Sequence, residues 1–157
     1  MEDEIRASLI ELKLLPIQEG HWKKIDFCLC SDSTREKYDE AKRKIRIHVP
    51  DKSKGIYVLM KDTEVLYIGE SGSSIQRRMI RHIDKIYSRK DERSQFFKQR
   101  QHQGDLSYYH FELSSLPSVH RKLIEESMNI VIKPSYLIWT SRFKLQQLNK
   151  LLMADVQ

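Results

Sequence analysis

The sequence has few cysteines, no long apolar segment and no secretory signal. Its two cysteines, Cys28 and Cys30, are too few for a disulfide framework or for a zinc site of their own, so we expect reduced thiols. No apolar run approaches the roughly 18 residues that a membrane helix needs. The acidic start, MEDEIRASLIEL, lacks the basic and then apolar order of a secretory signal. We therefore expect a cytoplasmic protein that does not span a membrane.

The composition is typical of a globular chain with one basic segment. Apolar residues make up 39% of the 157 residues and charged residues 32%, which suits a single domain with a short appendage. The net charge is +6, and residues 75–100 carry all of this excess, with nine Lys or Arg against three acids. This excess favours a polyanionic partner, the alternative being a solvated charged helix. Charge alone does not separate DNA from RNA or an acidic protein.

The first fifty residues are expected to form an N-terminal appendage that could contact DNA or set specificity. It would contain an amphipathic helix over residues 2–15 and a short strand within HWKKIDFCLC. Ser33 and Glu36 have the spacing of a capping box, which predicts a second helix that ends near residue 44. The turn-rich sequence PDKSK at 50–54 marks the expected boundary of a central module over residues 51–135.

The central module is predicted to be α+β, with a small three-stranded antiparallel sheet flanked by helices. Strands are expected over 56–60, 65–68 and 106–113, helices from 75 and over 118–133, and a polar basic loop over 88–104. Inward positions would be Ile75, Met79, Ile83 and Ile86 in the first helix and Leu123, Ile124, Met128, Val131 and Ile132 in the second. Residues 136–157 would add a helix capped by Thr140 or Ser141, whose face of Phe143, Leu148, Leu151 and Leu152 docks on the core or pairs two subunits.

Two tripeptides, GIY at 55–57 and YIG at 67–69, occupy matching positions on the first two predicted strands. Pairing would bring Tyr57 near Tyr67, while Gly55 and Gly69 would permit close approach of a backbone or ligand. Ordinary sheet packing is the alternative, since tyrosine favours strands. The pattern resembles the GIY-YIG nuclease superfamily over roughly residues 55–134. Its members include homing endonucleases, restriction enzymes and excision-repair subunits, and they cleave DNA with one divalent metal.

The resemblance implies further site residues, which can be sought position by position. The family has Ser or Thr two places after YIG, here Ser71, and an Arg about ten residues after the second tyrosine with His or Tyr four residues later. Arg77 and Arg78 both fit by distance. On a helical wheel Arg77 faces away from the apolar stripe, whereas Arg78 and His82 lie together on its shoulder, so we choose Arg78.

The family also has a Glu nine residues before a Pro that ends the later helix, which here is Glu125 before Pro134. The neighbouring Glu126 falls on the solvent side of the wheel. One position departs from the pattern, because the family commonly has Asn three residues after that Pro and this chain has Leu137. Asn129, four residues after Glu125, is an alternative source of an amide.

The resemblance assigns roles to these residues. Glu125 would hold one Mg²⁺ or Mn²⁺, and Arg78 would bind phosphate oxygens. Tyr57 would take the proton of the attacking water, Tyr67 would orient that water or a phosphate oxygen, and His82 would relay the proton or position Tyr57. The chain would be a restriction-type or phage/homing-type endonuclease acting on double-stranded DNA, with a homodimer as one way to cut both strands. The DNA backbone would contact Arg77, Arg81, Lys85, Arg89, Lys90 and Arg93.

Two rival functions remain at this point. One is a nucleic-acid-binding module of the same fold that is catalytically weak or inactive, which Leu137 supports. The other is a nuclease that acts on RNA. No zinc finger or separate recognition helix is visible in the sequence, so any sequence preference would come from the first fifty residues, the 88–104 segment or the last helix.

Overall fold

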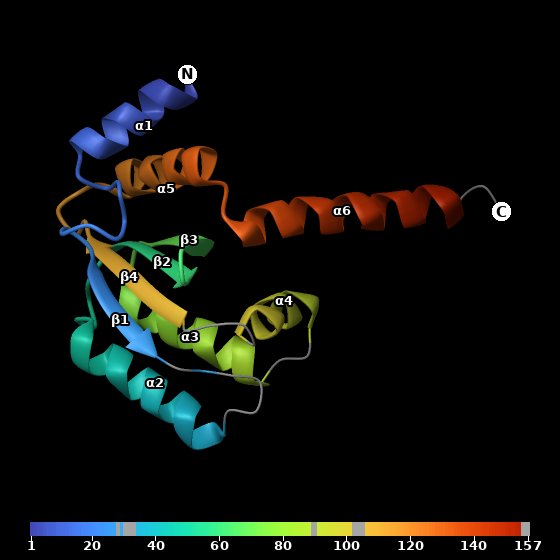
Figure 1. Ribbon diagram of the computed structural model, residues 1–157, viewed down its shortest axis with the longest axis horizontal. Helices are drawn as coiled ribbons and strands as arrows, with labels where there is room; N and C mark the ends of the chain where they lie inside the picture. Colours follow the sequence, from blue (N-terminus) through green and yellow to red (C-terminus); the bar gives the residue numbers. More distant parts are fainter. Residues whose placement is uncertain (28, 30–33, 89–90, 102–105, 155–157) are drawn as a thin grey trace.

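The computed structural model describes residues 1–27, 29, 34–88, 91–101 and 106–154, so the predictions for Cys28, Cys30 and Ser33 lie outside it. Figure 1 shows an antiparallel sheet between two layers of helices, which confirms the α+β prediction. The strands are β1 (Lys23–Phe27), β2 (Gly55–Lys61), β3 (Glu64–Ser71) and β4 (Leu106–Glu112), in the order β1-β4-β2-β3.

The prediction of three strands was wrong, because the sheet has a fourth at its edge. Strand β1, from the segment predicted to be an appendage, pairs antiparallel with β4 from Lys23↔His110 to Phe27↔Leu106. Its Ile25 and Phe27 are buried, and the residues between and before them are exposed. The short strand expected within HWKKIDFCLC is confirmed, but its pairing with β4, about eighty residues away in sequence, was not predicted.

Two pairs of helices cover the two faces of the sheet. Figure 1 shows α1 (Glu2–Glu11) and α5 (Ser118–Ile132) on one face, with α2 (Arg35–His48) and α3 (Ile75–Ser88) on the other. Side chains of β2 alternate between the two cores: Ile56, Val58 and Met60 pack in the α1 and α5 layer, and Tyr57 and Leu59 in the α2 and α3 layer. Tyr57 therefore faces the helix that carries the predicted Arg78.

The predicted inward stripe of α3 is confirmed, since Ile75, Met79, Ile83 and Ile86 are all fully buried. Two serines shape the turn that leads into this helix. Ser71 Oγ accepts a hydrogen bond from the Ser74 amide at 3.0 Å, and Ser74 Oγ accepts one from the Arg77 amide at 3.2 Å. The serine that follows YIG thus fixes where α3 begins.

The segment predicted to be a loop over 88–104 contains helix α4 (Glu92–Gln101). Its polar composition hid it, because only Phe96 and Phe97 give it an apolar side, and both are buried. The Asp91 carboxylate accepts a hydrogen bond from the Ser94 amide at 2.8 Å and so caps the start of the helix. On α5, Leu123 was expected to face inward but is 60% exposed, because the fully buried side of that helix runs through Arg121, Met128 and Val131.

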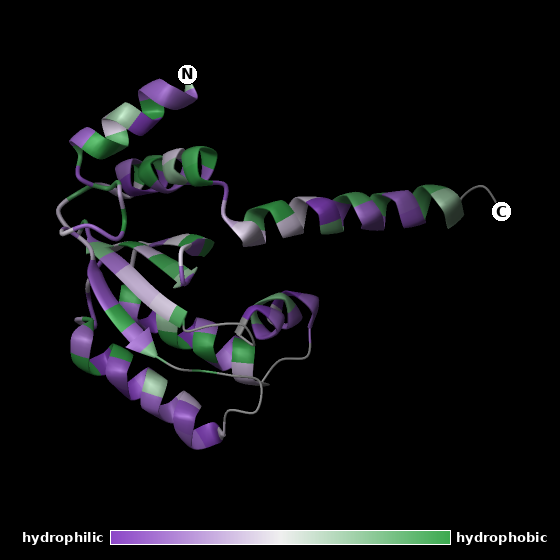
Figure 2. Cartoon of the chain, viewed as in Figure 1, coloured by the Kyte–Doolittle hydropathy of each residue, from purple (hydrophilic) through white to green (hydrophobic). Residues whose placement is uncertain are grey.

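The last helix, α6 (Ser135–Ala154), begins at Ser135 rather than at Thr140 or Ser141. The hydroxyls of Thr140 and Ser141 donate to the carbonyls of Tyr136 and Leu137, as serine and threonine do inside a helix. Most of α6 extends away from the rest of the molecule (Figure 1), with apolar residues along that length (Figure 2). Leu148, Leu151 and Leu152 are 52–66% exposed, so the expectation that this face docks on the core was wrong.

No helix in the described part of the chain is long and apolar enough to cross a membrane. The division at residues 50 and 135 stays a prediction.

Candidate active site

The two glycines of the tripeptides make room for neighbouring groups in the sheet. Tyr57 lies opposite Gly69 in the β2–β3 register, and a Cβ on Gly69 would stand only 2.5 Å from Tyr57 Cζ. A Cβ on Gly55 would stand 2.1 Å from the carbonyl oxygen of Phe111 in β4. Gly69 therefore admits the ring of Tyr57, and Gly55 admits a neighbouring backbone.

The two tyrosines lie side by side, with ring centroids 5.9 Å apart. The two phenols also influence one another, since Tyr67 raises the pKa of Tyr57 and Tyr57 lowers that of Tyr67. Burial is the main influence and raises the pKa of both phenols. The positive charge of Arg78 offsets this rise only in part. Tyr57 is therefore a neutral phenol in the free protein, and a role as base requires more positive charge than Arg78 supplies.

His82 packs against Tyr67 and not directly against Tyr57. Its ring centroid is 4.8 Å from that of Tyr67 and 4.7 Å from that of Phe97, and its Nδ1 lies 3.0 Å from the Tyr108 hydroxyl. Burial lowers the pKa of His82 to about 3, with smaller contributions from Lys85 and Arg78. A neutral imidazole held from both sides is suited to fixing the position of Tyr67.

Tyr108 was missed by the sequence analysis although it holds His82 in place. It is fully buried and makes an edge contact with Tyr57 at 6.3 Å between centroids. The available signal was the alternation in LSYYHFEL, which places residues 106, 108 and 110 of β4 on one face. That signal could not say that this face is also the face of Tyr57.

Glu125, on α5, is half-buried and electrostatically coupled to Tyr57, Tyr67 and Arg78, whereas Glu126 is exposed. Burial raises the pKa of the Glu125 carboxyl most, and the negative charge of Glu70 raises it further. A hydrogen bond from the Glu70 backbone and the charge of Arg78 act in the opposite direction. Glu125 thus lies near the tyrosine pair, in partly buried surroundings that disfavour its charged form.

A buried ion pair adjoins Glu125. Arg121 Nε lies 2.9 Å from Glu70 Oε1, and the two side chains are only 5% and 9% exposed. Arg121 also donates to the Leu116 carbonyl. This pair was not predicted from the sequence, although Arg121 stands four residues before Glu125 and so on the same side of α5. The pair ties the end of β3, at Glu70, to the helix that carries Glu125.

The donor set fits a single hard cation that is only partly held by protein. Across the described residues, no group of three or more His, Cys, Asp or Glu side chains could enclose a metal. Mg²⁺ typically uses one or two carboxylates, keeps several waters and binds substrate phosphates. Glu125, whose pKa is raised by burial and by Glu70, would gain from a nearby cation, so the residues present fit such an ion and exclude an all-protein cage.

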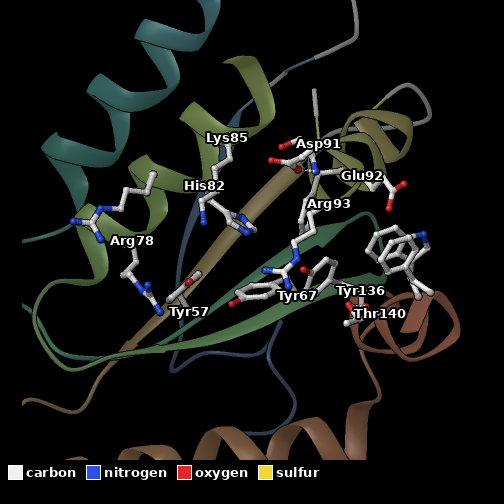
Figure 3. A pocket seen from close by; sticks show the side chains of 15 residues that line it. Tyr57, Tyr67, Arg78, His82, Lys85, Asp91, Glu92, Arg93, Tyr136 and Thr140 are labelled. Carbon is white, nitrogen blue, oxygen red and sulfur yellow. Dashed lines mark hydrogen bonds between the residues drawn. The ribbon is translucent and has the colours of Figure 1, made fainter. Parts of the chain in front are cut away.

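Beside these residues lies an open cleft of about 1150 Å³ between α3, α4 and α6. Tyr57, Tyr67 and His82 line its inner part, and basic side chains of α3 and α4 face aromatic ones of α6 (Figure 3). The basic residues are Arg78, Arg81, Lys85 and Arg93, and the aromatic ones are Tyr136, Trp139 and Phe143.

The predicted DNA-contacting residues do not all reach this cleft. Arg81, Lys85 and Arg93 line it. Arg77 lies outside it, with its Nε 3.2 Å from Asp51 Oδ1. Arg89 and Lys90 lie outside the described residues. Arg78 lines the cleft and Arg77 does not, which is the difference in orientation that the helical wheel predicted.

One buried histidine, His110, and one half-buried histidine, His82, give a prediction for stability against pH. His110, on β4, is buried, and neither ring nitrogen has a hydrogen-bond partner among the described residues. Burial lowers its pKa to about 4. Because the pKa values of His82 and His110 are lower folded than unfolded, the unfolded chain binds more protons below about pH 6.5. Stability should be full above that pH and fall as the pH drops toward 4, by about 1.4 kcal/mol per pH unit for each histidine.

Urea unfolding at pH 7.5 and pH 5 measures how much the free energy of unfolding falls between these pH values. In His110→Leu this fall should be smaller by about 2 kcal/mol. The same variant should be as stable as the wild type or more so at pH 7.5, because it removes an unsatisfied buried polar group. An unchanged pH dependence in this variant would show that His110 does not titrate on unfolding.

Comparison with protein-family models, curated proteins and solved structures finds no match to this chain.

Proposed function

We propose that this protein is a metal-dependent DNA endonuclease that hydrolyses phosphodiester bonds in the cytoplasm. One observation carries the proposal: Tyr57 and Tyr67 from two strands and Arg78 from α3 line a basic cleft, and Glu125 from α5 lies near enough to them for their charges to interact. These residues are the ones that the resemblance to GIY-YIG nucleases assigns to catalysis. Positive charge, an acidic metal ligand and oriented hydroxyls are the groups that phosphodiester hydrolysis requires.

Each side chain has a role that its surroundings favour. Arg78 is exposed and, within the described chain, makes no ion pair, so its guanidinium is available to two phosphate oxygens. Tyr67, held by His82, orients the attacking water or a phosphate oxygen. Tyr57 lies next to it, with ring centroids 5.9 Å apart. It would accept the water's proton only as a phenolate, which requires positive charge in addition to that of Arg78. The hydrolysis joins the water oxygen to phosphorus and releases the leaving oxygen, which takes up a proton.

The metal belongs at Glu125. A bound Mg²⁺ or Mn²⁺ would supply Lewis-acid stabilisation of charge on the phosphate. The chain's own contribution is to present a carboxylate beside Arg78 and the tyrosines, with Arg121 neutralising Glu70 next to it.

Supercoiled plasmid tests the proposed activity. The purified chain should nick it in Mg²⁺ or Mn²⁺ and leave it intact in EDTA, and binding should weaken steeply as salt rises. Sequencing the ends then decides the type, because defined ends indicate a restriction or homing enzyme. Absence of nicking with either metal would refute the endonuclease proposal.

Cleavage of both strands would be explained by a dimer through α6. Leu145, Leu148 and Leu152 follow at spacings of three and four and are 52–58% exposed, which is the pattern of a two-helix seam. They lie roughly on the opposite side of α6 from Trp139 and Phe143, so pairing would leave the cleft open. We propose that a second copy of this chain covers this leucine face.

Light scattering after gel filtration should therefore give twice the mass of one chain. Leu148→Asp should give the single mass, because it places a charge in the seam, and Gln146→Asp on the other side of the helix should not. A wild-type chain that elutes as a monomer would contradict the dimer.

The rival function is a nucleic-acid-binding module that does not cleave. Two observations favour it: Leu137 stands where the family commonly has Asn, and burial raises the pKa of Tyr57. Binding of plasmid without metal-dependent nicking would support this reading.

A further inference from the structure

The cleft extends past the candidate active site along a series of aromatic rings. Starting at Phe97 on α4, the series passes through Tyr136, Trp139 and Phe143 on α6. Successive centroids are 5.1, 5.8 and 5.3 Å apart, with planes inclined by 25°, 23° and 10°. Phe97 is buried, whereas the three rings of α6 are only half-buried and line the cleft. Aromatic surface thus leads from Tyr67, which also contacts Phe97 and Tyr136, toward solvent.

The opposite side of the cleft carries positive charge. Arg78, Arg81 and Lys85 recur along one side of α3, and Arg93 comes from α4. All four are exposed, and within the described chain none of them makes an ion pair. Asp91 and Glu92 also line the cleft, but they lie at the start of α4, where Asp91 caps the helix and the helix dipole favours acidic groups.

Aromatic rings facing cations across one groove match the chemistry of unpaired nucleotides. Phosphates need the cations, and the flat faces of bases stack on aromatic rings, which contributes about 1–3 kcal/mol per base. A closed duplex satisfies only the cations, because its base faces are stacked inside. The volume of about 1150 Å³ exceeds the usual 300–1,000 Å³ of a pocket for one small ligand.

We propose that this cleft binds a DNA strand with unpaired nucleotides next to the bond that is cut. Its phosphates would lie on the cations of α3 and α4. Its bases would lie on Trp139 and Phe143, on the parts of these half-buried rings that their stacked neighbours leave uncovered. The favoured substrates would then be forked, flapped or single-stranded DNA rather than uniform duplex. The preference for cutting such substrates rests on the proposed nuclease function. The preference for binding them does not.

Fluorescence anisotropy in EDTA measures binding without cleavage. Labelled forked or single-stranded DNA should bind at least tenfold more tightly than a blunt duplex of the same length at the same salt. Trp139→Ala should weaken binding to forked DNA about tenfold or more and change duplex binding little. The matched control is Tyr87→Ala, which removes an aromatic ring on α3 that is 42% exposed and does not line the cleft.

Tryptophan emission gives a second readout that a merely structural role would not move. The chain has two tryptophans, and Trp22 is buried in the core under α1 and α5. Unpaired DNA should therefore quench the emission of Trp139, and Trp139→Phe should lose the quenching but keep binding within a few-fold, because phenylalanine still stacks. This variant also covers the case in which Trp139→Ala does not fold.

Equal affinity for forked DNA and duplex, or forked-DNA binding unaffected by both Trp139 variants, would overturn the inference. Plasmid nicking is scored separately. Nicking without a preference for unpaired DNA refutes the inference alone, and the preference without nicking supports it while refuting the nuclease.

Discussion

Glu125→Gln should reduce Mg²⁺-dependent plasmid nicking by about 10³-fold or more. The change keeps the shape of the side chain and removes the negative charge that would hold the metal, whose Lewis-acid contribution is several kcal/mol, with about 1.4 kcal/mol per tenfold in rate. Binding of DNA in EDTA should be unchanged or slightly tighter, since a negative charge beside Arg78 is lost. Initial nicking rates on supercoiled plasmid, with protein in excess, measure the effect.

Glu126→Gln is the matched control, because it makes the same chemical change at the neighbouring, exposed position of α5. It should leave the nicking rate within about twofold of the wild type. If the two variants were equally active, the metal would not be held by Glu125 and the proposed site would be wrong. If both variants were inactive, the loss of nicking would reflect damage to helix α5 and not the removal of one carboxylate.

Gly55→Ala should destabilise the fold by about 3 kcal/mol or more, because overpacking of this kind exceeds what a small shift relieves. The added Cβ would stand 2.1 Å from the Phe111 carbonyl oxygen and 2.9 Å from the Leu113 amide nitrogen. Both are backbone atoms, and residue 55 pairs with Glu112 in the sheet, so relief requires β2 and β4 to separate. Thermal unfolding should show a melting temperature lower by about 10 °C.

Gly72→Ala provides the comparison. Its Cβ would meet the Arg121 Nη2 atom at 3.2 Å, so the guanidinium that Glu70 and the Leu116 carbonyl hold would have to shift slightly. The cost should be about 1 kcal/mol, well below that of Gly55→Ala, because a side chain and not a backbone must move. Equal stability of the two variants would show that β2 and β4 are not packed as closely as described.

Residue patterns were a good guide to elements whose stabilising contacts are local. The spacing of Ile75, Met79, Ile83 and Ile86 predicted α3, and all four are fully buried. Helix α4 was not predicted because it has only two apolar residues, Phe96 and Phe97, whose ring contacts come from α6, β3 and α3. Two apolar residues are too few to show the helical spacing of an amphipathic helix, and Tyr136, which contacts both, lies some forty residues further along the chain.

Some residues of the candidate site could likewise be predicted from local spacing, and others could not. Helical geometry placed Arg78 rather than Arg77 toward the sheet and Glu125 rather than Glu126 toward the interior, and the structure arranges them so. Tyr108, the Arg121–Glu70 pair and the aromatic side of α6 were not found. Each becomes visible only when strands and helices from different parts of the chain are packed together.

By itself the sequence determined the α+β class, the glycine–tyrosine hairpin and the turn-by-turn orientation of α3 and α5, because backbone periodicity and side-chain size act within a few residues. Only the tertiary structure decided that β1 closes one edge of the sheet, that Tyr57 is buried and His82 half-buried, both with altered pKa values, and that α6 faces the basic helices across a cleft. The physical reason is that burial, electrostatic coupling and a groove are properties of surfaces brought together from distant parts of the chain, and no local pattern specifies which surfaces meet.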